Sequence, residues 1–166
     1  MEIERKWMVK GWPELDMPLL AVENMRQGYL HADAPVVRIR REEKVGGDAR
    51  FVLCIKSGGR LVRHEVETLI GADQFEELEQ MIGLPLIEKE RRTYLTRDGM
   101  HLEVNHVDAG LPSEFWYAEV EYPSEEEARG WDPANADLAA YLGEDVTDLP
   151  GQSMAEYWVQ TRLQKA

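Results

Sequence analysis

The chain has 166 residues, of which 43% are hydrophobic and 31% are charged, a composition and length typical of one soluble domain spanning 1–166. It has 19 lysines and arginines against 32 acidic residues, and the net charge of −13 argues against nucleic acid or an anionic membrane as a partner. No apolar run approaches the roughly 20 residues needed to cross a bilayer, and no signal-peptide core is present, so we expect a cytoplasmic protein. Cys54 is the only cysteine, so we expect neither an internal disulfide nor a cysteine-based zinc site.

Alternation of polar and apolar residues dominates the chain and is broken by turn residues at intervals that suit antiparallel strands. Glycine-rich turns are expected at 46–48, 58–59 and 98–99, each joining two strands as a hairpin. The predicted strands lie near 1–9, 23–31, 36–44, 49–57, 61–69, 87–97, 100–105 and 114–122.

Four helical segments fill the gaps between these strands. Asp73 with Glu76 forms a predicted capping box for a helix that ends before Gly83. Ser124 with Glu127 repeats the device for a short helix. Two further helices are expected over 134–142 and over 153–165.

Charged residues recur at every second position within several of the predicted strands. Near the amino terminus Glu2, Glu4 and Lys6 project from one face of a strand, whereas Ile3 and Trp7 project from the other. The same parity groups charged residues on later strands. The cations of this set are Lys6, Arg38, Arg40, Lys56, Lys89 and Arg91, and the anions are Glu2, Glu4, Glu65, Glu67, Glu119 and Glu121, with Glu103 and Asn105 as a further pair.

Two interpretations of these charged faces are open. A single row is most simply a solvated face whose charges pair across strands. For the whole set, however, the opposite faces are apolar enough to need helices packed outside a curved sheet, which leaves the charges inside. The interior of an eight-stranded barrel is filled by side chains or holds one small ligand. Charges enclosed there must be hydrated, paired with one another, or bound to a charged ligand and a metal.

The nature of the charges indicates which ligand would suit such an interior. Arginine and lysine bind phosphate oxygens, and carboxylates are hard oxygen ligands for Mg²⁺ or Mn²⁺. An interior with both groups is suited to a polyphosphate bound together with a divalent metal.

The motifs that carry these charges resemble, over nearly the whole chain, those of the CYTH superfamily, the triphosphate tunnel metalloenzymes. Glu2, Glu4 and Lys6 match the family's amino-terminal Glu-x-Glu-x-Lys. Further matches are 27–30, Arg38-Ile39-Arg40, Lys56, Glu65-Val66-Glu67, Lys89-Glu90-Arg91, Ala118-Glu119-Val120-Glu121 and 143–147. Two features depart from the family pattern: Asn105 stands where an acidic residue is common, and 151–158 lacks the usual Tyr-x-Asn-x-x-Leu.

The resemblance, to small bacterial inorganic triphosphatases in particular, implies an α+β fold. Its core would be an eight-stranded antiparallel closed β-barrel, or tunnel, with peripheral helices and a carboxyl-terminal helix near one mouth. Within it, Glu2, Glu4 and Lys6 are expected to be catalytic. The triphosphate-binding residues implied are Lys6, Arg38, Arg40, Lys56, Lys89 and Arg91, and the ligands implied for Mg²⁺ or Mn²⁺ are Glu2, Glu4, Glu65, Glu67, Glu103, Glu119 and Glu121.

The function predicted from these residues is that of a divalent-metal-dependent triphosphatase. It would hydrolyse a short linear polyphosphate, with inorganic triphosphate as the first choice, by in-line attack of water. Two alternatives stay open: a class IV-type adenylate cyclase that forms cyclic AMP from ATP, and a non-catalytic polyphosphate sensor. A small-molecule triphosphate is the expected partner. A homodimer is also considered, although no residue locates its interface.

Overall fold

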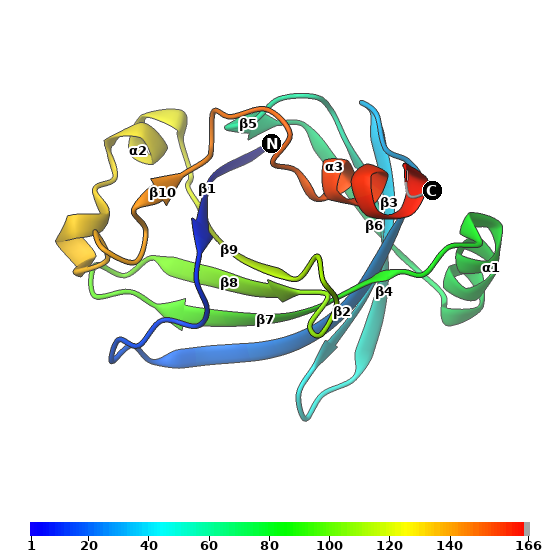
Figure 1. Ribbon diagram of the computed structural model, residues 1–166, viewed down its shortest axis with the longest axis horizontal. Helices are drawn as coiled ribbons and strands as arrows, with labels where there is room; N and C mark the ends of the chain where they lie inside the picture. Colours follow the sequence, from blue (N-terminus) through cyan, green and yellow to red (C-terminus); the bar gives the residue numbers. More distant parts are fainter. Residues whose placement is uncertain (165–166) are drawn as a thin grey trace.

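The computed structural model describes residues 1–164, which form mainly antiparallel β-strands with short helices around them (Figure 1). The strands are β1 (Glu2–Val9), β2 (Leu19–His31), β3 (Val36–Lys44), β4 (Ala49–Lys56), β5 (Val62–Arg63), β6 (Glu65–Ile70), β7 (Ile87–Leu95), β8 (His101–Val107), β9 (Phe115–Glu121) and β10 (Glu144–Asp145). The helices are α1 (Ala72–Ile82), α2 (Glu125–Gly130), the 3₁₀-helix η1 (Pro133–Ala136), α3 (Met154–Trp158) and the π-helix η2 (Val159–Leu163), which continues α3.

The strands form one sheet that curls into a nearly closed barrel. Its hydrogen-bonded order is β10-β1-β9-β8-β7-β2-β3-β4-β6, and β5 approaches closure by pairing with β1, where Val62 lies opposite Ile3. The predicted α+β barrel is therefore confirmed. Within residues 1–164 this path has nine strands rather than the expected eight, because the two-residue strand β10 adds to the edge of β1. The strand expected over 61–69 is also interrupted at His64, which separates β5 from β6.

The first two helices form where the sequence predicts them, but one cap differs. The residue that precedes α1 is Gly71, whose N–H donates to the side chain of Gln74 at 2.9 Å, so the predicted cap at Asp73 is wrong. Ser124 caps α2 as predicted, because its hydroxyl accepts a hydrogen bond from the N–H of Glu127 at 3.1 Å.

Of the two later helices, one is much shorter than predicted and the other forms where it is expected. The helix expected over 134–142 is wrong: only η1 forms, and Asp137 ends it in the left-handed conformation with a φ of 58°. The last helical segment begins after Ser153 as expected and continues through η2 to Leu163, whereas Lys165 lies outside the described residues. None of the described helices is long and apolar enough to cross a membrane.

The apolar faces of the strands lie on the outside of the barrel and are mostly covered, although Ile55 of β4 and Val66 of β6 are exposed. Trp7 and Val120 of β1 and β9 are buried in a cluster that includes Ala128 of α2 and Leu138 beyond η1. On another side α1 packs against β2, β3 and β4, with Phe75 buried in a second cluster. Figure 1 shows α1 outside the barrel and α3 near one of its mouths. This outer apolar layer leaves the charged faces of the strands turned toward the interior.

Candidate active site in the barrel interior

The barrel contains a cavity of about 340 Å³ that is lined mainly by charged and polar side chains. Eleven of the twelve charged positions grouped by strand parity line it, together with Glu103. These lining residues are Glu2, Glu4, Lys6, Arg38, Arg40, Lys56, Glu65, Glu67, Arg91, Glu119 and Glu121. The twelfth, Lys89, is buried behind Tyr117, to whose hydroxyl its ammonium donates a hydrogen bond at 2.6 Å.

Carboxylates gather on the side of the cavity formed by β1 and β9. Glu2, Glu4 and Glu121 each offer an oxygen within 4.8 Å of the others, and Glu4 is hydrogen-bonded to Glu119. The strand register causes this, since Glu4 lies opposite Glu121 while Lys6 lies opposite Glu119. Four acidic side chains therefore meet at one place although β1 and β9 are far apart in the sequence.

The crowding of these carboxylates changes their acidity. Burial, and then the neighbouring charge of Glu119, raises the pKa of Glu4 well above its ordinary value. Burial and the charge of Glu103 raise the pKa of Glu121 to about 7. Burial acts in the same direction on Glu119, but the hydrogen bond with Glu4 and the charge of Lys6 lower its pKa to about 2. The cations beside these four glutamates therefore do not fully neutralise the negative charge of the cluster.

Cations gather on β3 and β7, which flank β2. Arg38, Arg40 and Lys89 are between 4% and 8% exposed, and Arg91 lies beside them. Burial and the charges of Arg38 and Arg91 lower the pKa of Arg40 to about 10, and burial and the charge of Arg91 lower that of Lys89. The Nε of Arg38 has no hydrogen-bond partner among residues 1–164. A buried donor without a partner beside several like charges is the signature of a site for an anion.

The two remaining cations lie on the acidic side. The ammonium of Lys56 is 3.1 Å from an oxygen of Glu2. That of Lys6 donates to the carbonyl oxygen of Gln152 and lies 4.3 Å from the centroid of the Tyr117 ring. Because Gln152 lies two residues before α3, Lys6 connects the interior of the barrel with the segment at its mouth.

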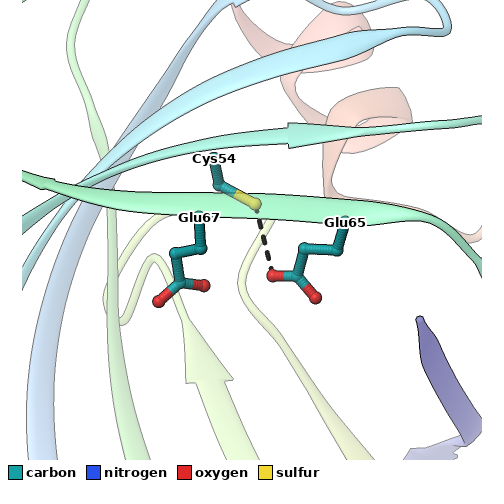
Figure 2. A group of neighbouring side chains, drawn as sticks. All are labelled: Cys54, Glu65 and Glu67. Carbon is teal, nitrogen blue, oxygen red and sulfur yellow. Dashed lines mark hydrogen bonds between the residues drawn. The ribbon is translucent and has the colours of Figure 1, made fainter.

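A second group lies on β4 and β6, where Cys54, Glu65 and Glu67 each offer a ligand atom within 4.8 Å of the others and the thiol of Cys54 faces Glu65 (Figure 2). The Cys54 thiol donates a hydrogen bond to Glu65 at 3.3 Å. Burial, opposed by the charge of Arg38, raises the pKa of this thiol to about 11, so the thiol is protonated at neutral pH while no metal is bound. Glu67 is half-exposed and pairs with Arg50 at 3.4 Å. Glu65 and Glu67, predicted as metal ligands, thus form a second cluster with Cys54, and Glu65 also contacts Glu2 of the first cluster.

Comparison with known proteins places this barrel in a family. No protein-family model matches the chain. An inorganic triphosphatase of Nitrosomonas europaea, however, is 34% identical to it over 147 residues, which cover 89% of each protein. The chain belongs to the family of this triphosphatase. A crystal structure of an inorganic triphosphatase superposes with a TM-score of 0.61 and 27% identity, covering 95% of this chain and 93% of the other. A protein of Pyrococcus horikoshii has the same fold, with a TM-score of 0.65, 18% identity, and coverage of 98% and 100%.

The structure explains why Asn105 can stand where other members of the triphosphatase family often have an acidic residue. Asn105 is fully buried and its side-chain oxygen accepts a hydrogen bond from the Nε of Arg91 at 3.0 Å, while Glu103 pairs with the same guanidinium at 3.1 Å. Burial opposes ionisation of Arg91, but the charge of Glu103 outweighs it and raises the pKa of Arg91. Asn105 and Glu103 thus orient an arginine in this structure, whereas Glu103 was predicted as a metal ligand.

Sequence reasoning assigned no role to Arg63, which lines this cavity, or to the side chain of Gln27, which lies behind its wall. Arg63, on the same face as Glu65, donates from Nη2 to Glu2 and to Glu4, both at 3.1 Å. Gln27 accepts from the Nε of Arg40 at 3.0 Å and is fully buried. Parity places Arg63 on the correct face, but only the closure of the barrel by β5 brings it to the carboxylates of β1.

Proposed function

We propose that this protein is a divalent-metal-dependent triphosphatase whose substrate is inorganic triphosphate. The observation that carries the proposal is the division of one enclosed cavity into a cation-rich side and a carboxylate-rich side. A short polyphosphate chain needs cations along its length and a metal near the bond that breaks. The relationship to a named inorganic triphosphatase over 89% of both chains supports the same assignment.

The carboxylate group has the chemistry that a divalent metal requires. Its donors are hard oxygens from Glu2, Glu4 and Glu121, close enough to share one ion. Burial, and then the negative charge of Glu119, raise the pKa of Glu4, and a bound cation would oppose both effects. These residues fit Mg²⁺ or Mn²⁺, and we assign them as the ligands. When bound, the ion would draw negative charge from the phosphate oxygens and lower the pKa of a bound water.

The other charged residues would bind and orient the substrate. Arg38, Arg40 and Arg91 would hold the phosphate chain by charge-assisted hydrogen bonds, with the free Nε of Arg38 as one donor. Lys6, on the carboxylate-rich side, would contact the phosphoryl group nearest the carboxylates. Lys89 would act through Tyr117 and help to keep that side of the cavity positive.

The reaction follows from this placement. A water oxygen attacks the terminal phosphorus in line with the bond to the leaving pyrophosphate oxygen, and the new O–P bond forms as that bond breaks. The proton of the water passes to a glutamate of the β1–β9 group, and the cations absorb the charge that develops on the leaving pyrophosphate. The products are orthophosphate and pyrophosphate.

A phosphate-release screen tests the proposal. Inorganic triphosphate, thiamine triphosphate, ATP and GTP are each incubated with the protein and with Mg²⁺ or Mn²⁺. We expect the highest kcat/KM with inorganic triphosphate and no release in EDTA. Formation of cyclic AMP and pyrophosphate from ATP would show a cyclase instead, and tight triphosphate binding without turnover under either metal would show a sensor.

A further inference from the structure

Arg63 occupies an unusual place between two carboxylates of the cavity. One atom of its guanidinium, Nη2, is 3.1 Å from an oxygen of Glu2 and 3.1 Å from an oxygen of Glu4. Both of these residues belong to the group that offers oxygens within 4.8 Å for a metal, and an ion that bound them would compete with Arg63 for the same lone pairs. Arg63 therefore lies where the positive charge of the ion is needed.

The surroundings show that this contact compensates charge inside the barrel. The side chains of Arg63 and Glu2 are only 19% and 11% exposed, so water screens their interaction weakly. Lys56 also pairs with Glu2, but Glu4 has Glu119 beside it and depends on Arg63 for its ion pair. The guanidinium thus compensates the negative charges of both Glu2 and Glu4 while no ion is present.

The guanidinium of Arg63 is also close enough to the cavity to contact a bound triphosphate. It lines the same cavity as Arg38, Arg40 and Lys6, into which a triphosphate would enter. Its backbone is held by pairing with Glu2 in β1, so a change of side-chain rotamer alone would turn the guanidinium from the carboxylates toward the cavity.

We propose that Arg63 is a positioning residue that neutralises Glu2 and Glu4 in the substrate-free protein and transfers to the phosphate chain when a divalent ion takes those carboxylates. This inference rests on the proposed function, because it assumes that the cavity takes a triphosphate together with a metal. It implies that the metal alone binds weakly, since it must displace a cation. Metal and triphosphate together bind cooperatively, since the displaced arginine then gains a new anionic partner.

Binding measurements test the inference separately from catalysis. Mn²⁺ affinity is measured without substrate, by the loss of the free-ion electron paramagnetic resonance signal, for the wild type and for Arg63→Gln. The matched control is Arg129→Gln, which removes an exposed arginine of α2 whose only ion pair among residues 1–164 is with Glu125, one helical turn away. Affinity for inorganic triphosphate is then measured by calorimetry with Ca²⁺ in place of Mn²⁺, to slow turnover.

We expect Arg63→Gln to bind Mn²⁺ at least about tenfold more tightly than the wild type, because a buried positive charge that opposes the metal ion is lost. We expect it to bind triphosphate at least about tenfold more weakly, because the same positive charge would attract the anion. Arg129→Gln should match the wild type in both measurements. If Arg63→Gln fails to fold, Arg63→Lys, which keeps the charge but loses the fork, should give changes in the same directions and smaller. Unchanged or weaker Mn²⁺ binding in the folded Arg63 variant would overturn the inference. Failure of the wild type to release phosphate would refute the proposed function and leave this result standing.

Discussion

Replacement of Arg40 by glutamine should increase the stability of the barrel while it damages the site. Arg40 is buried beside Arg38 and Arg91, and its pKa of about 10 against an ordinary 12.5 corresponds to about 3 kcal/mol that disfavours the charged guanidinium in the folded state. Arginine is charged in the folded and unfolded states near pH 7. The penalty is therefore fully present at neutral pH and would fall only as the pH rises above about 10.

The net gain in stability is smaller than this penalty. Arg40→Gln also removes the hydrogen bond from Arg40 Nε to Gln27, which contributes about 1 kcal/mol. We therefore expect the free energy of unfolding in urea to rise by about 1–2 kcal/mol at pH 7, with an unchanged m-value. If the side chain makes two charge-assisted hydrogen bonds to the phosphate chain, its loss should cost about 3 kcal/mol of transition-state stabilisation, or roughly a hundredfold in kcat/KM.

The opposite signs of these two effects make the experiment decisive. A residue that served only the fold would lower stability on removal and leave kcat/KM intact, and that pair of results would refute the assignment of Arg40 to the substrate. Arg97→Gln is the matched control, because Arg97 is 63% exposed and pairs at the surface with Asp137. Its free energy of unfolding should stay within about 0.5 kcal/mol of the wild-type value, and so should the transition-state free energy calculated from its kcat/KM.

Three further changes test other parts of the structure. Asp108→Asn should lower the free energy of unfolding in urea by about 3 kcal/mol, because it leaves the buried guanidinium of Arg162 without its ion pair. Hydrogen bonds from Arg162 outweigh burial and lower the folded-state pKa of Asp108 below 3.8, so the difference from the wild type should be full above that pH and vanish as acid protonates the folded carboxyl. Gly28→Ala should lower the melting temperature and cost about 1–3 kcal/mol, since its Cβ would lie 2.5 Å from a methyl carbon of Leu86; an unchanged melting temperature would contradict this packing. Glu4→Gln should lose most of its kcat while inorganic triphosphate still binds, and an intact kcat at saturating metal would show that the β1 assignment is wrong.

Strand parity made most of the site predictable, because a strand places alternate residues on the same face whatever the rest of the fold does. Glu2, Glu4 and Lys6 line the cavity as that rule requires. Parity cannot show which charges meet across the interior. Glu103, grouped with the metal ligands by resemblance, pairs with Arg91 because the register of β7 and β8 brings them together, and this register depends on pairing along the whole sheet.

The helices were less predictable than the strands for a related reason. A helix over 134–142 is consistent with the local pattern of apolar residues, yet Leu138 and Leu142 are buried in the cluster outside β1 and β9 without forming an α-helix. Their burial stabilises a compact turn as well as it would a helix, because the hydrophobic effect depends on area and not on backbone conformation. Tertiary packing thus overrode a weak local preference.

The buried cations of the interior lower the stability of the barrel, and the apolar clusters outside it compensate for this loss. Arg38, Arg40, Lys89 and Arg91 repel one another in a space with little water, and burial opposes the charge of each. The stability needed to hold them must come from elsewhere, and the buried apolar clusters that include Trp7 and Phe75 supply it. A ligand that neutralises these cations binds the folded state alone, so inorganic triphosphate at a hundred times its Kd would add about 2.7 kcal/mol to the free energy of unfolding. A barrel that becomes more stable when an anion enters is one whose interior charges are arranged for that anion rather than for the fold.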